Sequence, residues 1–310
     1  MGAIQLLNID EFYLFASSKS KGKKVTFMSK EYIVNELTHE VPKQAFDYAL
    51  FSAGGSISKE YAKEFVENGT TVIDNSSAFR MDEDVPLIVP EVNFESIKNS
   101  KLIANPNCST IQAVLPLFVL NKKYGIKRIV FSTYQAVSGA GKKGIDDLVN
   151  TEKGLPPKKF PHKIYNNCLP HIDSFDESGY TKEELKMINE TKKILNAPDL
   201  NITATCVRVP VNNCHSESIN VELNSPFDLE ILKQDLSKFK GIVVLDDPKF
   251  NIYPLNAFAD GKDDVFVGRL RKDYSVEHGV NMWVVADNIR KGAASNAVQI
   301  LEKLLNEKNA

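Results

Sequence analysis

Short hydrophobic runs alternate with helical patterns along the first third of the chain. Residues 46–55, 70–77 and 101–108 each have the pattern of a buried strand that ends in small or polar residues. Residues 58–69 start with a serine, continue with helical spacing and end in glycine, which predicts a helix. Alternating strands and helices are typical of a wound α/β unit, in which ligands bind where the strands end. The pattern therefore predicts an α/β domain with a ligand site at these strand ends.

The pattern changes at about residue 126, where the strands become longer and richer in aromatic and β-branched residues. The predicted strands of this second region are 127–137, 202–211, 216–223, 264–270 and 280–287. Helical patterns at 182–196 and 227–239 interrupt them, and residues 151–181 predict a long irregular excursion. We expect a mixed sheet with helices on one face, followed by an amphipathic C-terminal helix over 287–308.

The length and composition agree with this division and exclude several classes of protein. A chain of 310 residues is longer than one core usually supports, so two domains are expected. With 38 basic and 40 acidic residues there is no charge excess to bind nucleic acid or an anionic membrane. The longest apolar run, 113–120, is too short to span a bilayer. Four cysteines do not make a disulfide framework in a chain of this length, which favours a cytoplasmic protein.

Cys108 is the first candidate for chemistry. It lies in "NPNCSTIQ" (105–112), directly before a predicted helix over 109–125. The N–H groups and the dipole of a helix N-terminus favour a thiolate, and they could also stabilise an oxyanion formed by its attack on a carbonyl. The alternative is that Cys108 is a small packed residue.

A thiolate mechanism needs an acid or base, and His215 is the most interesting of the five histidines. It lies between two predicted strands in "RVPVNNCHSES" (208–218), close to Arg208, although a lone histidine is more often structural. Cys214 is adjacent, but neighbouring residues of an extended chain point to opposite faces. We therefore interpret Cys214 as a packing residue.

Two further patterns are weaker. His162, Cys168 and His171 offer three metal ligands within ten residues, but no fourth ligand has a recognisable spacing, so zinc remains a distant alternative. A literal G-x-G-x-x-G runs from Gly139 to Gly144, but no second strand ending in an acidic residue follows it about twenty positions later. We interpret it as a flexible loop near a site.

In this order along the chain, "NPNCSTIQ", "STYQAVSGAGKKG" (132–144), "NETKKIL" (189–195) and "RVPVNNCHSES" resemble the aspartate-semialdehyde dehydrogenases. The segments "NSSAFR…VPLIVPEVN" (75–93) and "ADNIRKGAASNAVQI" (286–300) are similar as well. The resemblance implies the reductive dephosphorylation of 4-phospho-L-aspartate to the semialdehyde by NADPH, in lysine, threonine and methionine biosynthesis. It also implies a homodimer that binds a small-molecule substrate and phosphate, and no metal.

The resemblance implies a role for several individual residues. Cys108 corresponds to the nucleophile that forms a thioacyl intermediate, Gln135 to the glutamine that orients it, and His215 to the general acid/base. Substrate-binding residues would be Arg208 for the carboxylate and Glu190 for the ammonium, with Arg80, Lys193 and Asn107 around the phosphate. From the sequence alone, a solvated i,i+3 ion pair is the better interpretation of Glu190 and Lys193.

The segment "FYLFASSKSKGKK" (12–24) resembles the cofactor-reading part of the family. Ser17, Ser18 and Lys19 follow a hydrophobic run, where an NAD-binding strand would carry an acid for the ribose, so they favour the 2′-phosphate of NADP. A solvated basic turn is the alternative. Further cofactor contacts implied by the resemblance are Ser52, Gly54, Ser138, Gly139 and Asn288.

The start of the chain departs from the family pattern. Members begin with a strand, a glycine-rich turn and a helix, whereas only eleven residues without such a turn precede Phe12. We therefore expect an incomplete Rossmann-like NADP-binding domain (1–107 and 288–310) and an α+β catalytic and dimerisation domain (108–287). A truncated, weakly active or non-catalytic remnant and an N-acetyl-glutamyl-phosphate reductase remain as alternatives.

Overall fold

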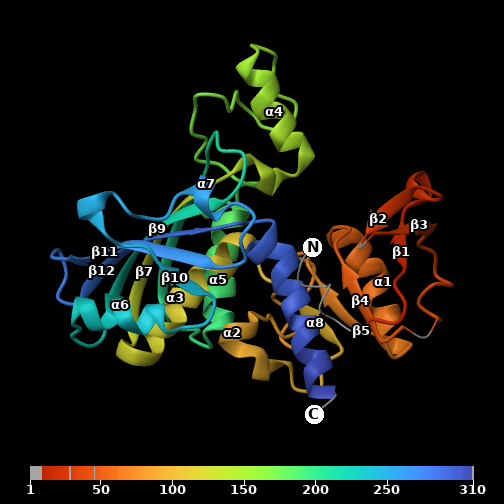
Figure 1. The fold of residues 1–310 in the computed structure, drawn as a ribbon, viewed down its shortest axis with the longest axis horizontal. Coiled ribbons are helices and arrows are strands. Elements are labelled where there is room, and N and C mark those ends of the chain that lie inside the picture. Colours follow the sequence, from red (N-terminus) through yellow and green to blue (C-terminus); the bar gives the residue numbers. More distant parts are fainter. Residues whose placement is uncertain (1–8, 28, 45, 309–310) are drawn as a thin grey trace. The chain divides into compact units, whose positions relative to one another are not determined.

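The computed structural model describes residues 9–27, 29–44 and 46–308 (Figure 1). Within this part, the chain forms two compact units. The first contains the described residues up to Pro90, Phe94–Asn105 and the chain from Ser295 onward; the second contains Glu91–Asn93 and Pro106–Ala294. The domain boundaries given above from the sequence stay a prediction. In the described residues, no helix is both long and apolar enough to cross a membrane.

The first unit contains the predicted α/β pattern. The parallel sheet has the strand order β4 (Tyr48–Phe51), β5 (Thr71–Asp74) and β6 (Leu102–Ala104). Helix α1 (Gly55–Glu67) connects β4 to β5 and contacts all three strands. The C-terminal helix α8 (Ser295–Lys308) packs Ile300 and Leu301 against Ile73 and Ile103. Buried aliphatic residues on the strands and the helix thus make one core.

A second small sheet in the first unit was only partly expected. Strand β1 (Leu14–Ala16) ends the hydrophobic run, pairs in parallel with β3 (Lys30–Glu36), and leads into a short 3₁₀ turn at Ser18–Ser20. Strand β2 (Lys24–Phe27) pairs antiparallel with β3. The sequence analysis missed this hairpin because most of its side chains are polar and exposed.

The second unit is built on the expected mixed sheet. Its strands, in order across the sheet, are β10 (Ile242–Val244), β11 (Val265–Asp273), β12 (Gly279–Ala286), β9 (His215–Leu223), β7 (Ile126–Gln135) and β8 (Asn201–Arg208). The outer pairs β10–β11 and β7–β8 are parallel, and the three inner pairs are antiparallel. The mixed sheet predicted from the sequence is confirmed.

Helices α3 (Cys108–Tyr124), α5 (Lys182–Ile194) and α6 (Leu229–Ser237) contact strands of this sheet and one another (Figure 1). Along β7, Phe131, Thr133 and Gln135 are buried, while Ser132 and Tyr134 between them are more accessible. This alternation follows from the two-residue period of a strand. The helices therefore cover one face of the sheet, and the other face carries partly exposed residues.

The remaining elements of the described chain are short or irregular. Helix α4 (Lys142–Glu152) is followed by 153–181, the expected excursion, which projects from the second unit around α4 (Figure 1). Helix α2 spans Pro90–Asn93, and α7 spans Asn256–Ala259. The predicted C-terminal helix starts later than expected, because residues Arg290–Ala294 form a π-helical turn before α8.

Candidate active site

Cys108 is the first residue of α3, as the sequence predicts. Asn107 is the N-cap of this helix, and its Oδ1 accepts the N–H groups of Ser109 (3.0 Å) and Thr110 (3.3 Å). The helix dipole therefore points its positive end at the Cys108 thiol. On its other side lies Gly292 of the π-helical turn: a Cβ added there would lie 3.0 Å from the Cys108 Cβ. A glycine is thus needed for the backbone to approach the thiol-bearing residue so closely.

His215 begins β9 and is fully buried. Its Nδ1 accepts the backbone N–H of Ala136 at 3.0 Å, so the neutral ring carries its proton on Nε2. Burial lowers the pKa of His215 well below its usual value, and the nearby Arg208 guanidinium lowers it further. His215 is therefore a neutral imidazole at pH 7, with an Nε2–H group as a hydrogen-bond donor.

Arg208 ends β8 and is also buried. Its Nη1 donates a hydrogen bond of 2.6 Å to the carbonyl oxygen of Ala136, the residue whose N–H binds His215. Burial lowers the pKa of Arg208, and the negative charge of Glu183 opposes this change. Gly139 lies against both groups, since a Cβ there would be 2.9 Å from Arg208 Nη1 and 3.1 Å from His215 Nε2. Arg208 and His215 therefore leave no room for a side chain at position 139.

Gln135 and Asn107 are joined by a carboxylate that the sequence analysis missed. Oε1 of Glu183, on the first turn of α5, accepts hydrogen bonds from Asn107 Nδ2 (2.9 Å) and Gln135 Nε2 (3.0 Å). An acidic residue in the first turn of a helix is common, so nothing in the sequence singles out Glu183.

Glu190 is also part of this cluster. It is only 1% exposed, and its Oε2 accepts the backbone N–H of Asn107 at 2.6 Å. Glu190 is therefore buried, so the solvated position that the sequence favoured for it is wrong. Lys193 lies one turn further along α5 and is half-buried.

Ser138 and Asn288, two predicted cofactor residues, are hydrogen-bonded to each other in the second unit. The Asn288 Nδ2 donates to Ser138 Oγ at 3.1 Å, and Ser138 Oγ donates to Asn213 Oδ1 at 2.9 Å. Asn213 Nδ2 in turn donates to Asp260 (2.6 Å) and Asp287 (3.1 Å). This chain of hydrogen bonds ties together three connecting loops of the unit.

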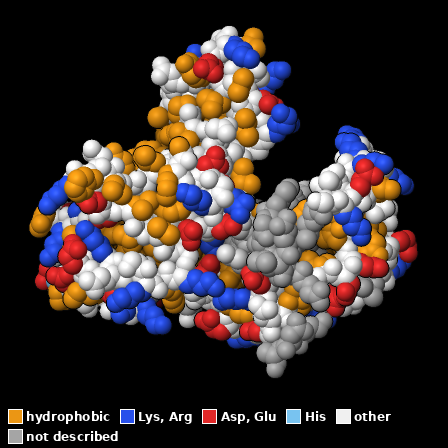
Figure 2. All heavy atoms as spheres, viewed as in Figure 1, with side chains coloured by type: hydrophobic (Ala, Val, Ile, Leu, Met, Phe, Trp, Pro, Cys, Tyr) orange, Lys and Arg blue, Asp and Glu red, His pale blue; other side chains and the backbone are white. Residues whose placement is uncertain are grey.

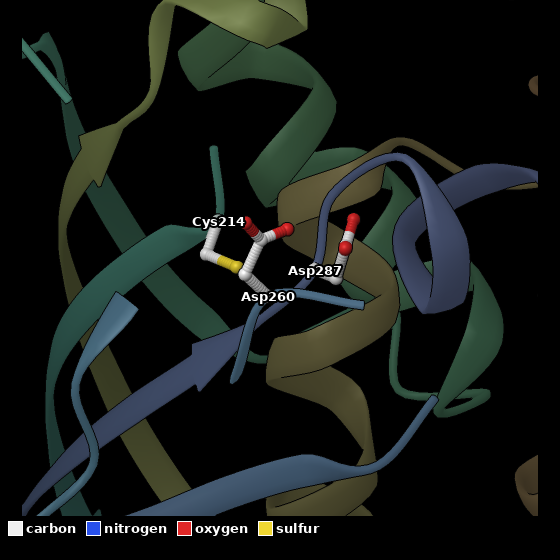
Figure 3. Close-up of side chains that lie close together, drawn as sticks. All are labelled: Cys214, Asp260 and Asp287. Carbon is white, nitrogen blue, oxygen red and sulfur yellow. The ribbon is translucent and has the colours of Figure 1, made fainter. Parts of the chain in front are cut away.

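Cys214, Asp260 and Asp287 lie close together beside this chain (Figure 3). Their potential ligand atoms lie within 4.8 Å of one another, but Asp287 already accepts the N–H groups of Gly261, Ile289 and Arg290. Burial, together with the two carboxylates, raises the pKa of Cys214 to about 12. Its side chain packs with Ala259, Phe266 and Val285. Asp287 thus binds backbone N–H groups of the connecting loops, so we call Cys214, Asp260 and Asp287 the capping cluster. Cys214 itself is a packed thiol.

The other predicted site residues lie in the first unit. Ser17, Ser18 and Lys19 form an exposed turn directly after β1. Ser52 and Gly54 lie between β4 and α1 and are exposed too. Arg80 is buried, and its Nη2 donates to the Asn75 carbonyl oxygen at 3.0 Å.

Of the two weaker sequence patterns, the metal candidates are not brought together in the described residues, whereas the glycine segment lies beside Arg208 and His215 through Gly139. In the described chain, the only group of three close metal-ligating side chains is the capping cluster, which excludes His162, Cys168 and His171. Cys168 is exposed, and the His171 ring stacks on Phe175. The G-x-G-x-x-G segment contributes a 3₁₀ turn, Val137–Ala140, and the start of α4.

Comparison with known proteins defines the class. Residues 5–100 match the NAD-binding domain of semialdehyde dehydrogenases, and residues 117–291 match their dimerisation domain. The protein is thus an oxidoreductase of the semialdehyde dehydrogenase class, with a cysteine at a helix N-terminus of its second unit.

Full-length relatives narrow this further. The chain is 55% identical to the aspartate-semialdehyde dehydrogenase of Aquifex aeolicus, over 96% of this chain and 91% of that protein. It is 48% identical to the one of Bacillus subtilis, over 96% and 90%. The crystal structure of aspartate-semialdehyde dehydrogenase II from Vibrio cholerae superimposes with a TM-score of 0.93, at 46% identity, over 97% of this chain and 92% of that one. The chain belongs to the aspartate-semialdehyde dehydrogenase family and has this enzyme activity.

These matches also decide two of the expectations. The match to the NAD-binding domain begins at residue 5, so it does not bear out the predicted loss of an N-terminal strand and glycine-rich turn. Residues 1–8 lie outside the described residues. The relatives favour the aspartate enzyme over an N-acetyl-glutamyl-phosphate reductase, and they give no support to a non-catalytic remnant.

Proposed function

We propose that the chain catalyses the reversible reaction of 4-phospho-L-aspartate, NADPH and a proton to L-aspartate 4-semialdehyde, phosphate and NADP⁺, with Cys108 as the nucleophile. The observation that carries this proposal is the position of Cys108 at the N-terminus of α3, in the same unit as buried Arg208 and His215. A solved structure of a family member from Vibrio cholerae is complexed with ASA, and one from Candida albicans contains NADP at 27% identity and a TM-score of 0.75.

The Cys108 thiolate attacks the acyl carbon of the substrate. The S–C bond forms, the bond from carbon to the phosphate oxygen breaks, and phosphate leaves with its electron pair, giving a thioester. NADPH, when bound, supplies the hydride that reduces this carbonyl carbon. The resulting oxyanion collapses, the C–S bond breaks, and the aldehyde leaves while Cys108 becomes a thiolate again.

His215 and Gln135 act on the carbonyl oxygen of the acyl group. The neutral His215 presents its Nε2–H, because Nδ1 is bound to the Ala136 N–H. As a base, Nε2 would need its proton moved to Nδ1, which faces an N–H donor. We therefore assign His215 the acid part of the predicted acid/base role: it donates a hydrogen bond or a proton from Nε2–H. The second N–H of the Gln135 amide is a further donor, and donors placed where negative charge develops lower the barrier.

The remaining side chains bind the substrate. The guanidinium of Arg208 suits the planar α-carboxylate, which it can bind with two parallel N–H bonds. Glu190 supplies a negative charge for the ammonium, and Lys193, Arg80 and Asn107 supply donors for the phosphate. The Glu190 contact to the Asn107 N–H supports this arrangement, since it holds the carboxylate next to the nucleophile.

We propose NADP as the cofactor. Ser17, Ser18 and Lys19 offer hydroxyl and ammonium donors on an exposed turn after β1, which fits a 2′-phosphate. The nearest acid at a strand end is Glu36 on β3, and Lys21 pairs with it at 3.2 Å. Gly54 has φ +93° and open space around the position of a Cβ, directly before α1, where backbone could approach a phosphate. Ser52, Ser138, Gly139 and Asn288 complete the proposed set.

We also propose a homodimer formed through the face of the six-stranded sheet that the helices leave uncovered. Tyr134 on this face is 38% exposed and its ring contacts Trp283. Hydrophobic side chains gather on the surface of the second unit (Figure 2). Residues 117–291 of this unit match the dimerisation domain of semialdehyde dehydrogenases. The replacement Tyr134→Asp is expected to convert dimers to monomers in analytical ultracentrifugation.

A cytoplasmic location is consistent with four free thiols.

The proposed chemistry is tested by following NADP⁺ reduction with L-aspartate 4-semialdehyde, which must depend on phosphate. Replacement Cys108→Ala is expected to reduce kcat at least about 10³-fold, because the nucleophile is lost. Cys168→Ala, at an exposed thiol outside the site, is the matched control and should retain activity. Full turnover in C108A, or a preference for N-acetyl-glutamate semialdehyde, would contradict the proposal.

A further inference from the structure

The irregular excursion over residues 153–181 is tied to helix α4 by one buried carboxylate. Asp147 is only 1% exposed, and its oxygens accept the backbone N–H groups of three consecutive residues, Lys158 (2.9 and 3.0 Å), Lys159 (2.7 Å) and Phe160 (2.9 Å). Burial would raise the pKa of Asp147, but these N–H groups outweigh it and hold the pKa below its usual value. Asp147 is therefore ionised at neutral pH, and this one side chain fixes the course of the turn.

The turn places the ring of Phe160 against the guanidinium of Arg208. The centre of the ring lies 5.9 Å from Arg208 Cζ, within the distance at which an aromatic ring attracts a cation. The ring also packs against the buried side chains of Val137, Ile164 and Leu169. The buried Arg208 therefore has an aromatic ring on one side, which belongs to the excursion.

The excursion also binds the backbone of Arg208. The Leu169 N–H donates to the Arg208 carbonyl oxygen at 2.9 Å, and the Arg208 N–H donates to the Leu169 carbonyl oxygen at 2.8 Å. Thr151, one turn after Asp147 on α4, accepts the N–H of Tyr165 at 3.2 Å. Two side chains of α4 thus anchor the excursion, and two residues of the excursion contact Arg208.

We propose that Asp147 and Phe160 are positioning residues for Arg208: the Asp147 carboxylate fixes the turn that lays the Phe160 ring on the guanidinium, so that the free N–H groups of Arg208 are held in place for the substrate carboxylate. This inference rests on the proposed function and deepens it, since it names what holds the side chain to which the carboxylate is assigned. Neither residue is assigned a contact with the reacting carbonyl. Their loss should therefore weaken substrate binding and leave the chemical step nearly unchanged.

The replacement Asp147→Asn tests the carboxylate with almost no change in volume. It places an –NH₂ group, which can only donate, among three N–H donors, so the turn loses part of its anchor. We expect KM for L-aspartate 4-semialdehyde to rise about 10-fold while kcat stays within about twofold of wild type. The matched control is Asp146→Asn at the preceding residue, which is exposed and pairs with Lys142 at 3.2 Å. D146N should keep the wild-type KM, and a wild-type KM in D147N would overturn the inference.

The replacement Phe160→Leu tests the ring and keeps an apolar side chain in its place. We expect KM for the semialdehyde to rise about fivefold, because the attraction between ring and cation is lost. The matched control is Phe175→Leu in the same excursion, where the ring is 60% exposed and stacks on His171. Equal rises of KM in F160L and F175L would overturn the role of the Phe160 ring. If D147N does not fold, F160L decides the inference.

An aldehyde without the carboxylate separates this role from a general loss of structure. 3-Aminopropanal is the semialdehyde without its α-carboxylate, so it offers nothing for Arg208 to bind. For 3-aminopropanal, kcat/KM of D147N and F160L should lie within about twofold of the wild-type value, whereas for the semialdehyde it should fall. Equal losses for the two aldehydes would mean that the variants damage the site in general, which contradicts the positioning role.

A further measurement does not depend on turnover. Lys158 and Lys159 lie in the anchored turn, so trypsin should cut after them sooner in D147N than in wild type, and at the wild-type rate in D146N. Unchanged cleavage in D147N would refute the anchoring by Asp147 even if the enzyme activity is as proposed. Conversely, full turnover in C108A would remove the proposed chemistry, and the cleavage rates would still decide the anchoring.

Discussion

The proposed ligand-binding residues of the two units differ in how strongly other residues hold them in place without a ligand. In the second unit, Arg208 and His215 are buried and both hydrogen-bond to the backbone of Ala136, and the buried Gln135 donates a hydrogen bond to Glu183. In the first unit, Ser17, Lys19 and their neighbours lie on an exposed turn. The catalytic unit is thus preorganised, whereas the cofactor's 2′-phosphate would meet solvated side chains. Replacements of these buried residues should change the chemistry, and replacements in the exposed turn should change cofactor affinity alone.

The largest expected effect is at Arg208, whose forked donors are buried. Arg208→Lys keeps the charge but loses the bidentate geometry and the hydrogen bond to the Ala136 carbonyl. We expect kcat/KM for the semialdehyde to fall about 10³-fold, which corresponds to about 4 kcal/mol. Steady-state kinetics measure this, with the exposed Arg271→Lys as control. An R208K enzyme with an unchanged KM would show that the carboxylate binds elsewhere.

The next effect tests how tightly the second unit is built. A methyl group at Gly139 would lie 2.9 Å from Arg208 Nη1 and 3.1 Å from His215 Nε2, so Gly139→Ala must displace one of them. A shift of about 1 Å in such groups can cost about 10²-fold in rate, and we expect kcat/KM to fall by about that factor. Thermal denaturation should show an intact fold. Wild-type kinetics in G139A would mean that the site is less rigid than the contacts suggest.

A smaller effect concerns stability. Glu217 on β9 is fully buried, neither of its oxygens has a hydrogen-bond partner that meets normal geometry, and Gln112 is the side chain beside it. Burial raises the pKa of Glu217 well above its usual value. Because the unfolded chain releases the proton at lower pH, the protein loses stability as pH rises from the ordinary carboxyl pKa toward this raised value.

Glu217→Gln removes that pH dependence and should stabilise the protein by about 1 kcal/mol at neutral pH. Melting temperatures of wild type and E217Q should coincide near pH 4 and diverge as pH increases. Glu222→Gln, on the same strand and paired with exposed Lys127, should give a small difference at every pH. A destabilised E217Q at pH 8 would show that the carboxylate is ionised and bound.

The smallest effect is expected in the first unit. Lys19→Ala removes one charge from the proposed 2′-phosphate site, which should raise KM for NADPH about fivefold, or about 1 kcal/mol, and leave KM for NADH unchanged. The melting temperature should not change, since Lys19 is exposed. Lys43→Ala, at an exposed lysine paired with Glu40, serves as control. An equal loss for both cofactors would place Lys19 outside the phosphate site.

The sequence predicted those parts of the molecule whose pattern has one simple cause. Strands β4, β5 and β6 and helix α1 follow from buried apolar runs and a clear helix end. The sequence did not predict the hairpin β2–β3, because most residues of its strands are exposed and many are polar. Cys108 and His215 were singled out from their local sequence and the role of Arg208 from the resemblance to the family, whereas Glu183 looks like any acid at the start of a helix. The His215 tautomer depends on the backbone N–H of Ala136, 79 positions away, which no sequence pattern records.

The Lys291–Glu91 ion pair has a consequence for dissecting the enzyme. Lys291 is fully buried in the second unit, and its Nζ binds both carboxylate oxygens of Glu91 at 2.8 Å. Glu91 belongs to the short segment Glu91–Asn93, which is part of the second unit although the rest of that unit begins only at Pro106. A gene fragment that begins at residue 106 would keep the lysine and lose its counter-ion, at a cost of about 3–5 kcal/mol. A self-standing catalytic fragment therefore has to carry residues 91–93 along, or replace Lys291 by an apolar side chain such as methionine.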